Sequence, residues 1–431
     1  MAYSTEQLAL YRRITLRVAP LTLLLYLVAF LDRVNVSFAA LTMNRDLGIS
    51  NATYGLAAGI FFFGYMLLAI PSNIMLQKVG ASRWIAVLMV AWGVVGCATA
   101  FVHGAGAYIV LRFLLGAAES GFLPGVVYYL TTWLPGRQRA GILAMLYMAI
   151  PLSSVVGSPI SAAILRVDGA WGLHGWQWLF LLEAMPAIVL GLAVPWLLDN
   201  GPDTATWLTD ADKVMLRESM QAEAAQTVTA SGTDRASAGL LAMLAATYFM
   251  LMIGLYELGF WTPKLIASHG ISLRWLGWLN ALPYAVGAVT LLPWCRWSDR
   301  HGDRRWILAG SFAAGSAGFL LTALAPSLPV LLLAISLASF GVYVSMPVFW
   351  AAVSQTVSPV AAAFAIALIN SVGNVGGFIG PYATGWLLDR THSYVVGLGC
   401  TAMALLIGAS LAATAFQKES AACGGNPLPP V

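Results

Sequence analysis

Long apolar runs alternate with short polar stretches along almost the whole chain. Each run has about 20 residues or more, enough for an α-helix to cross a hydrocarbon core of about 30 Å. Twelve runs can be counted, near residues 17–40, 52–76, 82–103, 107–133, 140–165, 176–198, 238–261, 275–296, 305–325, 329–354, 360–388 and 393–416. The pattern therefore predicts an all-α membrane protein with twelve transmembrane helices.

The composition supports a location in the membrane. Hydrophobic residues make up 59% of the chain and charged residues only 9%, whereas a soluble domain carries about 25% charged residues. The formal net charge of +4 is spread over short loops and forms no basic patch, so nucleic acid is not an expected partner. The four cysteines, Cys97, Cys295, Cys400 and Cys423, show no spacing typical of metal ligands. We expect the lipid bilayer and a small molecule as partners, and no metal.

The longest polar stretch, residues 199–237, separates the first six apolar runs from the last six. It predicts four parts, namely an N-terminal six-helix bundle (1–198), a cytoplasmic linker (199–237), a C-terminal six-helix bundle (238–416) and a cytoplasmic tail (417–431). Inside the linker, Thr209 stands where it can cap a short amphipathic helix, whose acidic first turn suits the helix dipole.

The two halves of the chain repeat each other at a constant offset of 222 residues. The matching positions are Pro71, Lys78, Gly80, Arg83, Trp84, Ile85 and Pro159 in the first half, and Pro293, Arg300, Gly302, Arg305, Trp306, Ile307 and Pro381 in the second. Two halves of the same orientation imply a pseudo-two-fold axis along the membrane normal. Such repeats place the substrate site near the midplane between the halves, with rocking motions for alternating access.

Basic residues are distributed unevenly between the predicted loops. If the N-terminus is cytoplasmic, that side of the membrane carries 15 Lys and Arg residues and the other side carries 5. The positive-inside rule therefore puts both termini in the cytoplasm. We expect the protein in a bacterial-type cytoplasmic (inner) membrane.

Two pairs of charged residues lie inside apolar runs, Asp32 and Arg33 in the first and Arg112 and Glu119 in the fourth. Charges at this depth are costly and usually face a cavity or a partner. Because guanidinium presents a fork of donors that matches a carboxylate, Arg33 and Arg112 are candidate ligands for an anion. A carboxylate in a poorly hydrated cavity binds a proton more readily, which makes Asp32 and Glu119 candidate proton carriers. The alternative is two ion pairs that only hold helices together.

Glu257 is a further charged residue, in the seventh apolar run. A glutamate there adds negative potential to a site for an anion, which is unfavourable unless it is protonated or accepts hydrogen bonds. It is therefore a candidate third titrating group, or a partner for a hydroxyl or amino group of the substrate. A satisfied polar residue near the extracellular mouth is the alternative.

The loop WSDRHGDRRW (297–306) resembles the signature loop of the major facilitator superfamily. The resemblance implies a gating role for Asp299, Arg300, Gly302, Arg304 and Arg305. Its counterpart in the first half, LQKVGASRW, has Gln77 where an aspartate is usual.

Within that superfamily the chain resembles the anion:cation symporter family nearly from end to end. FLDRVNVSFA (30–39), GIFFFGYMLLAIPSN (59–73), RFLLGAAESGFLPG (112–125), GWQWLFLLEAMPA (175–187) and FWTPKLI (260–266) are similar to that family's motifs. Three positions depart from the family's pattern, Ala69 and Val87, where a glutamate and an arginine are frequent, and Glu257, where a small or polar residue is usual.

The resemblance implies two six-helix bundles and proton-coupled uptake of a small organic anion, such as a sugar acid, a dicarboxylate or an aromatic carboxylate. It puts the family's substrate-binding arginine at Arg33 and its protonation sites at Asp32 and Glu119. Arg112 looks like the local partner of Glu119. The coupling ion is H⁺, no other cofactor is expected, and we expect a monomer.

Five polar or aromatic residues lie on helices that are the inner ones by analogy with the superfamily and are candidate substrate contacts, with plain packing as the alternative: Tyr65, Tyr147, Trp350, Asn370 and Asn374. The fifth helix reads VVGSPISAA and lacks the glycine–proline pattern of superfamily antiporters, which favours symport. A proton-coupled efflux antiporter stays open as the alternative.

Other classes of protein find no support. The sequence has no H-E-x-x-H motif, no nucleophile elbow and no phosphate-binding loop, so an enzyme is not expected. A receptor or structural protein would not need a twelve-helix repeat.

Overall fold

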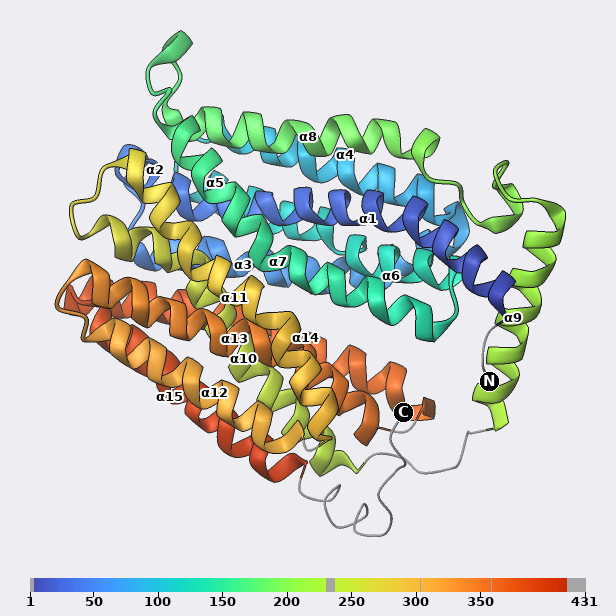
Figure 1. The fold of residues 1–431 in the computed structure, drawn as a ribbon. Coiled ribbons are helices and arrows are strands. Elements are labelled where there is room, and N and C mark those ends of the chain that lie inside the picture. Colours follow the sequence, from blue (N-terminus) through green and yellow to red (C-terminus); the bar gives the residue numbers. More distant parts are fainter. Residues whose placement is uncertain (1–3, 230–236, 303, 358, 417–431) are drawn as a thin grey trace. The chain divides into compact units, whose positions relative to one another are not determined.

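The computed structural model describes residues 4–229, 237–302, 304–357 and 359–416 (Figure 1). Throughout these ranges the regular structure is helical and no β-strand occurs. Twelve helical spans are long and apolar enough to cross a membrane. The predicted fold class, an all-α protein with twelve transmembrane helices, is therefore confirmed.

The contacts between residues divide the chain into two compact units. The first is Met1–Ala230 with Pro263–Ala281, and the second is Ser231–Thr262 with Leu282–Val431. The boundaries predicted for the bundles and the linker stay predictions, and the predicted tail, 417–431, lies outside the described residues.

The first unit contains the first six membrane spans and residues 199–230 of the predicted linker. Its helices are α1 (Thr5–Ala39), α2 (Met43–Asp46), α3 (Asn51–Val79), α4 (Ala81–Thr99), α5 (Ala105–Glu119), α6 (Phe122–Trp133), α7 (Gly136–Leu165), the short η1 (Ala170–Gly172), α8 (Gly175–Leu197), the short η2 (Pro202–Thr204) and α9 (Asp210–Thr229). α1 packs against α7 and α8, and α4 runs side by side with α8 (Figure 1).

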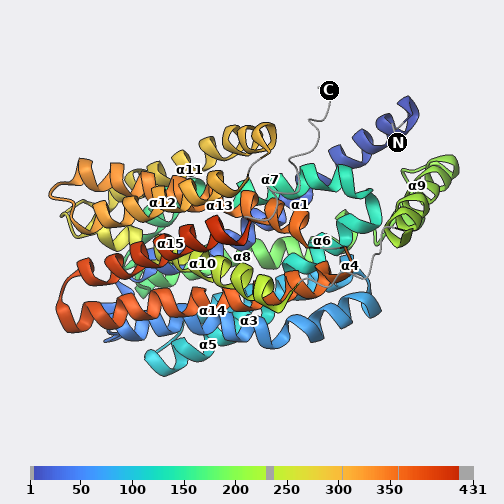
Figure 2. The same cartoon turned by 90° about the horizontal axis from the view of Figure 1, so that it is seen from below.

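The second unit is built from the remaining helices. They are α10 (Ala238–Ala267), α11 (Leu273–His301), α12 (Arg304–Ala323), α13 (Leu328–Thr356), α14 (Pro359–Thr391) and α15 (Tyr394–Ala415), although the end of α10 and the start of α11 belong to the first unit. α12 packs against both α13 and α15, and α14 against α15 (Figure 2).

The fourth span departs from a single helix, because α5 ends at Glu119 and α6 begins at Phe122. Pro124 has no N–H to donate to the carbonyl of residue 120, so the helical hydrogen bonds cannot continue there. A Cβ at Gly121 would collide with the Ser72 hydroxyl on α3, so only glycine allows this close approach. The break leaves Glu119 at the carboxyl end of a helix, where the helix dipole is negative.

Glycines bring α5 close to α3 next to this break. A Cβ at Gly116 would collide with the Phe61 carbonyl oxygen, and one at Gly64 with the Phe113 carbonyl oxygen. The two helices therefore touch backbone to backbone, as small residues allow in membranes. This contact holds the ring of Phe61 against the last turns of α5.

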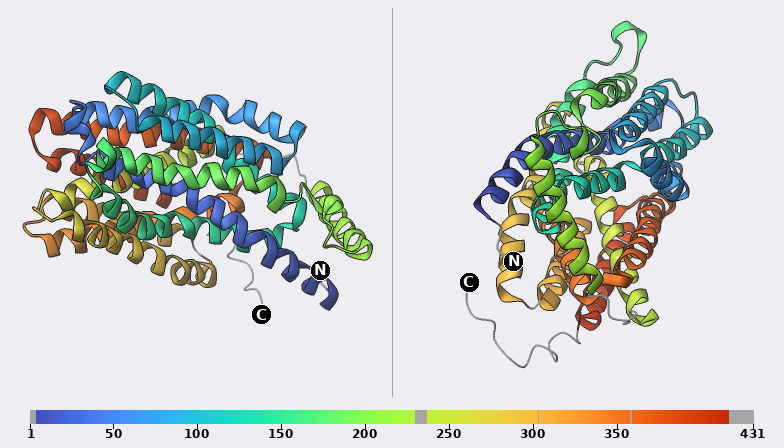
Figure 3. Two further views of the ribbon diagram at one scale, coloured as in Figure 1. Left: turned by 90° about the horizontal axis from the view of Figure 1, so that it is seen from above. Right: turned by 90° about the vertical axis from the view of Figure 1, so that its right-hand side faces the viewer.

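The predicted cap at Thr209 is confirmed. The Asp212 N–H donates to Thr209 Oγ1 at 3.2 Å, and the Thr209 N–H donates to Asp212 Oδ2 at 3.1 Å. Asp212 also pairs with Arg13 of α1 at 3.0 Å, and α9 lies across the end of the first unit beside the first turns of α1 (Figure 3). Burial raises the pKa of Asp212, but the hydrogen bonds from Thr209 and the charge of Arg13 outweigh it, so the pKa lies below its usual value.

The lowered pKa of Asp212 makes its contribution to stability depend on pH. Its stabilising effect is present above the unfolded-state pKa of about 3.9 and is lost as the pH falls through the folded-state pKa. Because Arg13 is half exposed, the pair contributes less than about 1 kcal/mol.

Trp207 ties the linker to the helices of the first unit. Its ring stacks on Trp133 of α6 with centroids 5.5 Å apart, and the Arg17 guanidinium lies 5.0 Å from its centroid on the indole face. Its indole N–H donates to Asp199 Oδ2 at 2.9 Å. One side chain thus joins α1, α6 and the chain that follows α8.

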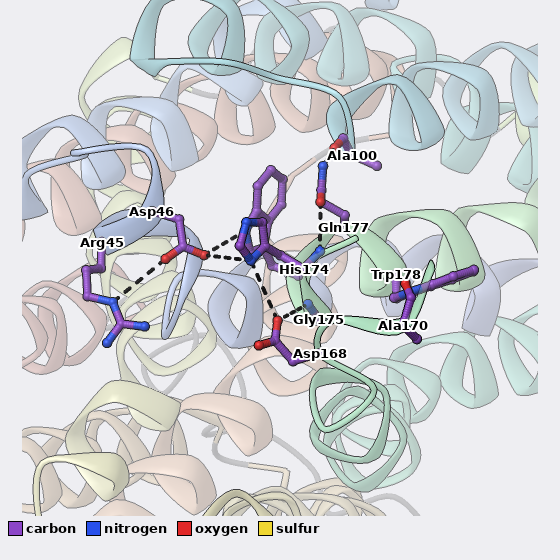
Figure 4. A network of polar contacts seen from close by, with 10 residues as sticks. Arg45, Asp46, Ala100, Asp168, Ala170, His174, Gly175, Gln177 and Trp178 are labelled. Carbon is purple, nitrogen blue, oxygen red and sulfur yellow. Dashed lines mark hydrogen bonds and ion pairs between the residues drawn. The ribbon is translucent and has the colours of Figure 1, made fainter. Parts of the chain in front are cut away.

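A polar network fixes the start of α8 at the opposite end of the unit (Figure 4). The Trp176 indole donates to Asp46 Oδ2 at 3.1 Å, and the Gly175 N–H donates to Asp168 Oδ1 at 2.7 Å. His174 Nδ1 lies 3.7 Å from a carboxylate oxygen of each aspartate. Because α8 is held from its first turn, the position of every residue further along this helix is defined.

We predict that Trp207→Ala destabilises the protein by about 2 kcal/mol, because a half-buried stacked tryptophan is lost. Thermal unfolding of the purified protein in detergent would show a Tm lower by several degrees. Trp196→Ala is the matched control, since Trp196 at the end of α8 is 84% exposed. Equal decreases in Tm for both variants would contradict the role of Trp207.

Candidate functional site

The structure brings α1 and α5 together through an ion pair. Arg33 Nη2 lies 2.9 Å from Glu119 Oε2, and Arg33 Nε donates to the same oxygen at 3.3 Å. The Arg33 side chain is 20% exposed, whereas that of Glu119 is 2% exposed. The cation therefore offsets both the carboxylate charge and the negative end of α5, and it is the more exposed of the two partners.

Aromatic rings flank the two arginines. The Phe30 ring centroid lies 4.6 Å from the Arg33 guanidinium carbon, and the Phe61 centroid lies 5.1 Å from those of both Arg33 and Arg112. Rings at these distances attract cations. Phe61 also meets Tyr65, one turn along α3, with centroids 6.2 Å apart, so this predicted residue lies beside the cluster.

Arg112 is more deeply buried than Arg33, at 2% exposure. Its Nε donates to the Ala57 carbonyl at 3.3 Å, and its Nη1 has no acceptor among the described residues. The resemblance suggested Arg112 as the local partner of Glu119, but the hydrogen-bonded partner in the structure is Arg33. Arg112 acts on Glu119 electrostatically without a hydrogen bond.

Asp32 is buried beside this ion pair, at 3% exposure. The Asn35 amide donates to its Oδ1 at a long 3.4 Å, and its Oδ2 has no hydrogen-bond partner among the described residues. The charged groups that act on it are Glu119, Glu183 and Arg112. Asp32 thus has no direct cationic partner of its own.

The structure adds Glu183, which sequence reasoning did not single out. It lies on α8 at 4% exposure, and its Oε1 accepts a hydrogen bond from the Ser161 hydroxyl of α7 at 2.6 Å. The sequence does contain a signal for this residue, because Glu183 lies in an apolar run as Asp32 and Glu119 do. It stood alone there, with no arginine nearby in the sequence.

The other predicted residue of the first unit, Tyr147, is half-buried on α7. In the second unit, Trp350 packs with Phe349 and with Tyr248 of α10, with the Trp350 and Tyr248 centroids 5.0 Å apart. Tyr248 was also missed by the sequence analysis, since a tyrosine in an apolar run carries no distinctive signal.

Asn370 and Asn374 are half-buried one turn apart on α14. A Cβ at Gly373 would collide with the Tyr248 ring, so this glycine lets the tyrosine lie against α14 beside Asn374. The structure therefore places Tyr248, Trp350 and the segment around Asn374 in one neighbourhood of the second unit.

Glu257 is 1% exposed on α10. Neither of its oxygens has a partner in hydrogen-bond geometry among the described residues, although the Thr384 hydroxyl of α14 lies close by. Tyr394 of α15 is within electrostatic range. The side chain is thus buried near hydroxyl groups of two other helices, and neither of its oxygens is in hydrogen-bond geometry with them.

The predicted gating loop joins α11 to α12. Arg304 Nη2 lies 2.8 Å from Asp299 Oδ1, Gly302 has a φ of +72° that suits glycine, and the Arg305 guanidinium lies 4.5 Å from the Trp306 ring centroid. Arg300 is exposed. The loop's Asp303 lies outside the described residues.

No group of three or more metal-ligating side chains occurs in the part of the chain that the structure describes. The charged centre of the first unit, formed by Asp32, Arg33, Arg112, Glu119 and Glu183, therefore consists of carboxyl and guanidinium groups. It can bind an anion, and it can bind protons.

The sequence is similar to a family of transport proteins and to individual transporters. The sequence model described as Major Facilitator Superfamily matches residues 22–276 and 237–427. A putative tartrate transporter of Agrobacterium vitis is 46% identical, over 93% of this chain and 90% of that protein. A quinolone resistance transporter of Acinetobacter baumannii is 37% identical, over 94% of this chain and 95% of that protein.

Among solved structures, a bacterial homologue of the human lysosomal transporter Spinster superposes with a TM-score of 0.75 at 16% identity. The alignment covers 94% of this chain and 96% of that one. At this identity the similarity concerns the fold alone.

Proposed function

Because this chain belongs to the Major Facilitator Superfamily and is a membrane transporter and not an enzyme, we propose that it takes up a small organic anion together with protons. The observation that carries this proposal is the ion pair between Arg33 and Glu119. It joins a partly exposed guanidinium to a buried carboxylate at the break of the fourth span.

The ion pair suggests how anion and proton are coupled. A substrate carboxylate that binds the fork of Arg33 competes with Glu119 for the same donors. Glu119, 2% exposed and at the negative end of α5, is then left without its cation. An unpaired buried carboxylate is costly, so Glu119 binds a proton as the anion binds. Release of the anion restores the ion pair and expels the proton.

The substrate class follows from the relatives and from the chemistry of the site. The relative named as a tartrate transporter supports a small hydroxylated dicarboxylate. Arg33 supplies the fork for one carboxylate. Asn370, Asn374 and Trp350 stay candidate contacts predicted from the sequence, because amide groups suit hydroxyls and an indole ring offers an apolar surface.

Efflux by proton antiport is the second candidate, supported by the relative named as a quinolone resistance transporter. Right-side-out membrane vesicles distinguish the two directions. With the outside more acidic than the inside, a symporter accumulates labelled tartrate, and collapse of the gradient by a protonophore abolishes the accumulation. Accumulation that requires the inside to be more acidic would support efflux and contradict uptake.

Arg33→Lys keeps the charge but removes the planar fork. We predict an apparent affinity about 10- to 100-fold weaker, because one charge-assisted hydrogen bond contributes about 1.5–3 kcal/mol. Binding of tartrate to purified protein by calorimetry measures this change. Arg166→Lys, at an exposed position of the same unit, is the matched control. Unchanged affinity in Arg33→Lys would remove Arg33 from direct contact with the substrate.

Asp32→Asn and Glu119→Gln test the proton-carrying residues. We predict that each variant abolishes accumulation driven by a pH gradient, because a coupling carboxyl group is lost. At least one of them still exchanges internal for external substrate, since exchange does not require the empty carrier to return. Counterflow in vesicles measures the exchange. If both variants accumulate substrate as the wild type does, these residues are not the coupling sites.

Glu257 is proposed to hold a proton while the anion is bound, or to accept a hydrogen bond from a substrate hydroxyl. Burial without a donor is costly for a carboxylate and tolerable for a carboxylic acid. Glu257→Gln is expected to shift the pH optimum of uptake in the first case and to narrow the preference among hydroxylated acids in the second. Uptake with the pH profile, affinity and selectivity of the wild type would contradict both roles.

A further inference from the structure

The proposed coupling of anion and proton does not involve Glu183. This residue is nevertheless buried as deeply as Asp32 and Glu119, which the coupling does involve. Of the described residues, only five charged side chains are buried, and four of them belong to the first unit: Asp32, Arg112, Glu119 and Glu183. With the half-buried Arg33, the membrane-embedded centre of this unit holds three carboxyl groups and two guanidinium groups.

The position of Glu183 is fixed by close helix packing. A Cβ at Gly96 of α4 would lie 2.8 Å from Ala184 Cβ, and one at Gly93 would lie 2.6 Å from Ile188 Cγ1. On the other side, the Ser161 hydroxyl of α7 donates to Glu183 Oε1 at 2.6 Å. α8 therefore cannot shift to bring this carboxyl group to water without losing these contacts.

The remaining oxygen of Glu183 is unsatisfied. Oε2 has no hydrogen-bond partner among the described residues. Oδ2 of Asp32 on the neighbouring helix α1 has none in hydrogen-bond geometry there either, although the Trp92 indole of α4 lies close by. A buried carboxylate with a missing donor is costly, whereas a carboxylic acid can donate a hydrogen bond itself. Asp32 and Glu183 each have one oxygen without a hydrogen-bond partner, and their helices pack together. One proton, held by either carboxyl group, would relieve this deficit.

The titratable and charged groups near Glu183 belong to several helices. Asp32 of α1, which Arg33 follows in the sequence, interacts electrostatically with Glu183, and the thiol of Cys97 on α4 lies 4.0 Å from the carbonyl of Leu181, two residues before Glu183 on α8. The described part of the α7 span contributes hydroxyl groups and no buried charge. Glu119 and Arg112 of α5 act on Asp32.

We propose that Asp32 and Glu183 hold one proton between them in the empty carrier, so that Glu183 sets the proton affinity of Asp32. This inference rests on the proposed function. Two guanidinium groups balance two carboxylates, and a third ionised carboxyl group would leave a net negative charge in the membrane interior. Because Glu119 is ionised by its pairing with Arg33, the proton belongs to the other two carboxyl groups.

Glu183 is then a positioning residue that acts through charge. While it is ionised, its negative charge favours the protonated form of Asp32, since like charges disfavour joint ionisation. Without it, Asp32 and Glu119 alone balance the two arginines and no resident proton is needed. Uptake then requires a more acidic exterior to load Asp32.

We predict that Glu183→Gln shifts the external pH of half-maximal uptake lower by about one unit. Counterflow at a pH below the shifted midpoint stays within about twofold of the wild type. Initial rates of tartrate uptake in right-side-out vesicles measure both. Glu183→Asp keeps an ionisable group and should retain the wild-type profile. Ser153→Ala, which changes a buried hydroxyl group of α7 that donates to its own helix, is the matched control and should leave the midpoint unchanged.

Infrared spectroscopy of the purified carrier without substrate provides a readout independent of transport. The carboxylic acid C=O band, recognised by its shift in D₂O, should lose intensity in Glu183→Gln and equally in Asp32→Asn, because either change removes the need for the shared proton. A folded Glu183→Gln variant with an unchanged band and an unchanged midpoint would overturn the proposal. Failure of the wild type to accumulate tartrate under a pH gradient would instead contradict the proposed function, while the infrared result still decides the proposal.

Discussion

The ion pair between Arg33 and Glu119 is the interaction on which the chemistry of the first unit depends. In a membrane interior an ionised group needs a partner, and each arginine and carboxylate can have only a few. Glu119 satisfies one half of the Arg33 fork at 2.9 Å while Arg33 keeps a fifth of its side chain exposed. If the substrate anion binds Arg33, as we propose, it meets a cation that is already paired with Glu119, and its binding leaves Glu119 without that partner.

Several features of the fold serve this balance. Gly121 and Pro124 break the fourth span immediately after Glu119, which puts the carboxylate at the negative end of α5 and makes its charge depend on Arg33. The glycine contacts between α3 and α5 hold Phe61 between the two guanidinium groups. At the start of α8, the network of Asp46, His174 and Trp176 anchors the helix that carries Glu183 (Figure 4).

The sequence predicted the twelve spans because their apolar lengths match the membrane, and it predicted the cap at Thr209 because capping is local. It did not predict which arginine binds Glu119. Arg112 and Glu119 are two turns apart on one helix, and only the structure, in which the Arg33 side chain of α1 reaches the end of α5, shows that Arg33 is the hydrogen-bonded partner. Glu183 was missed for a similar reason, since its neighbours Ser161 and Asp32 lie on other helices.

In the proposed coupling, anion binding to Arg33 leaves the charge of Glu119 to be compensated by a proton instead of by Arg33. Proton uptake during binding measures this directly, by recording the pH of a weakly buffered solution of purified carrier while tartrate is added. The account predicts uptake of about one proton for each anion bound near neutral pH, and much less in Glu119→Gln, whose residue 119 is already neutral. Binding of tartrate without proton uptake, or the same uptake in Glu119→Gln, would contradict it.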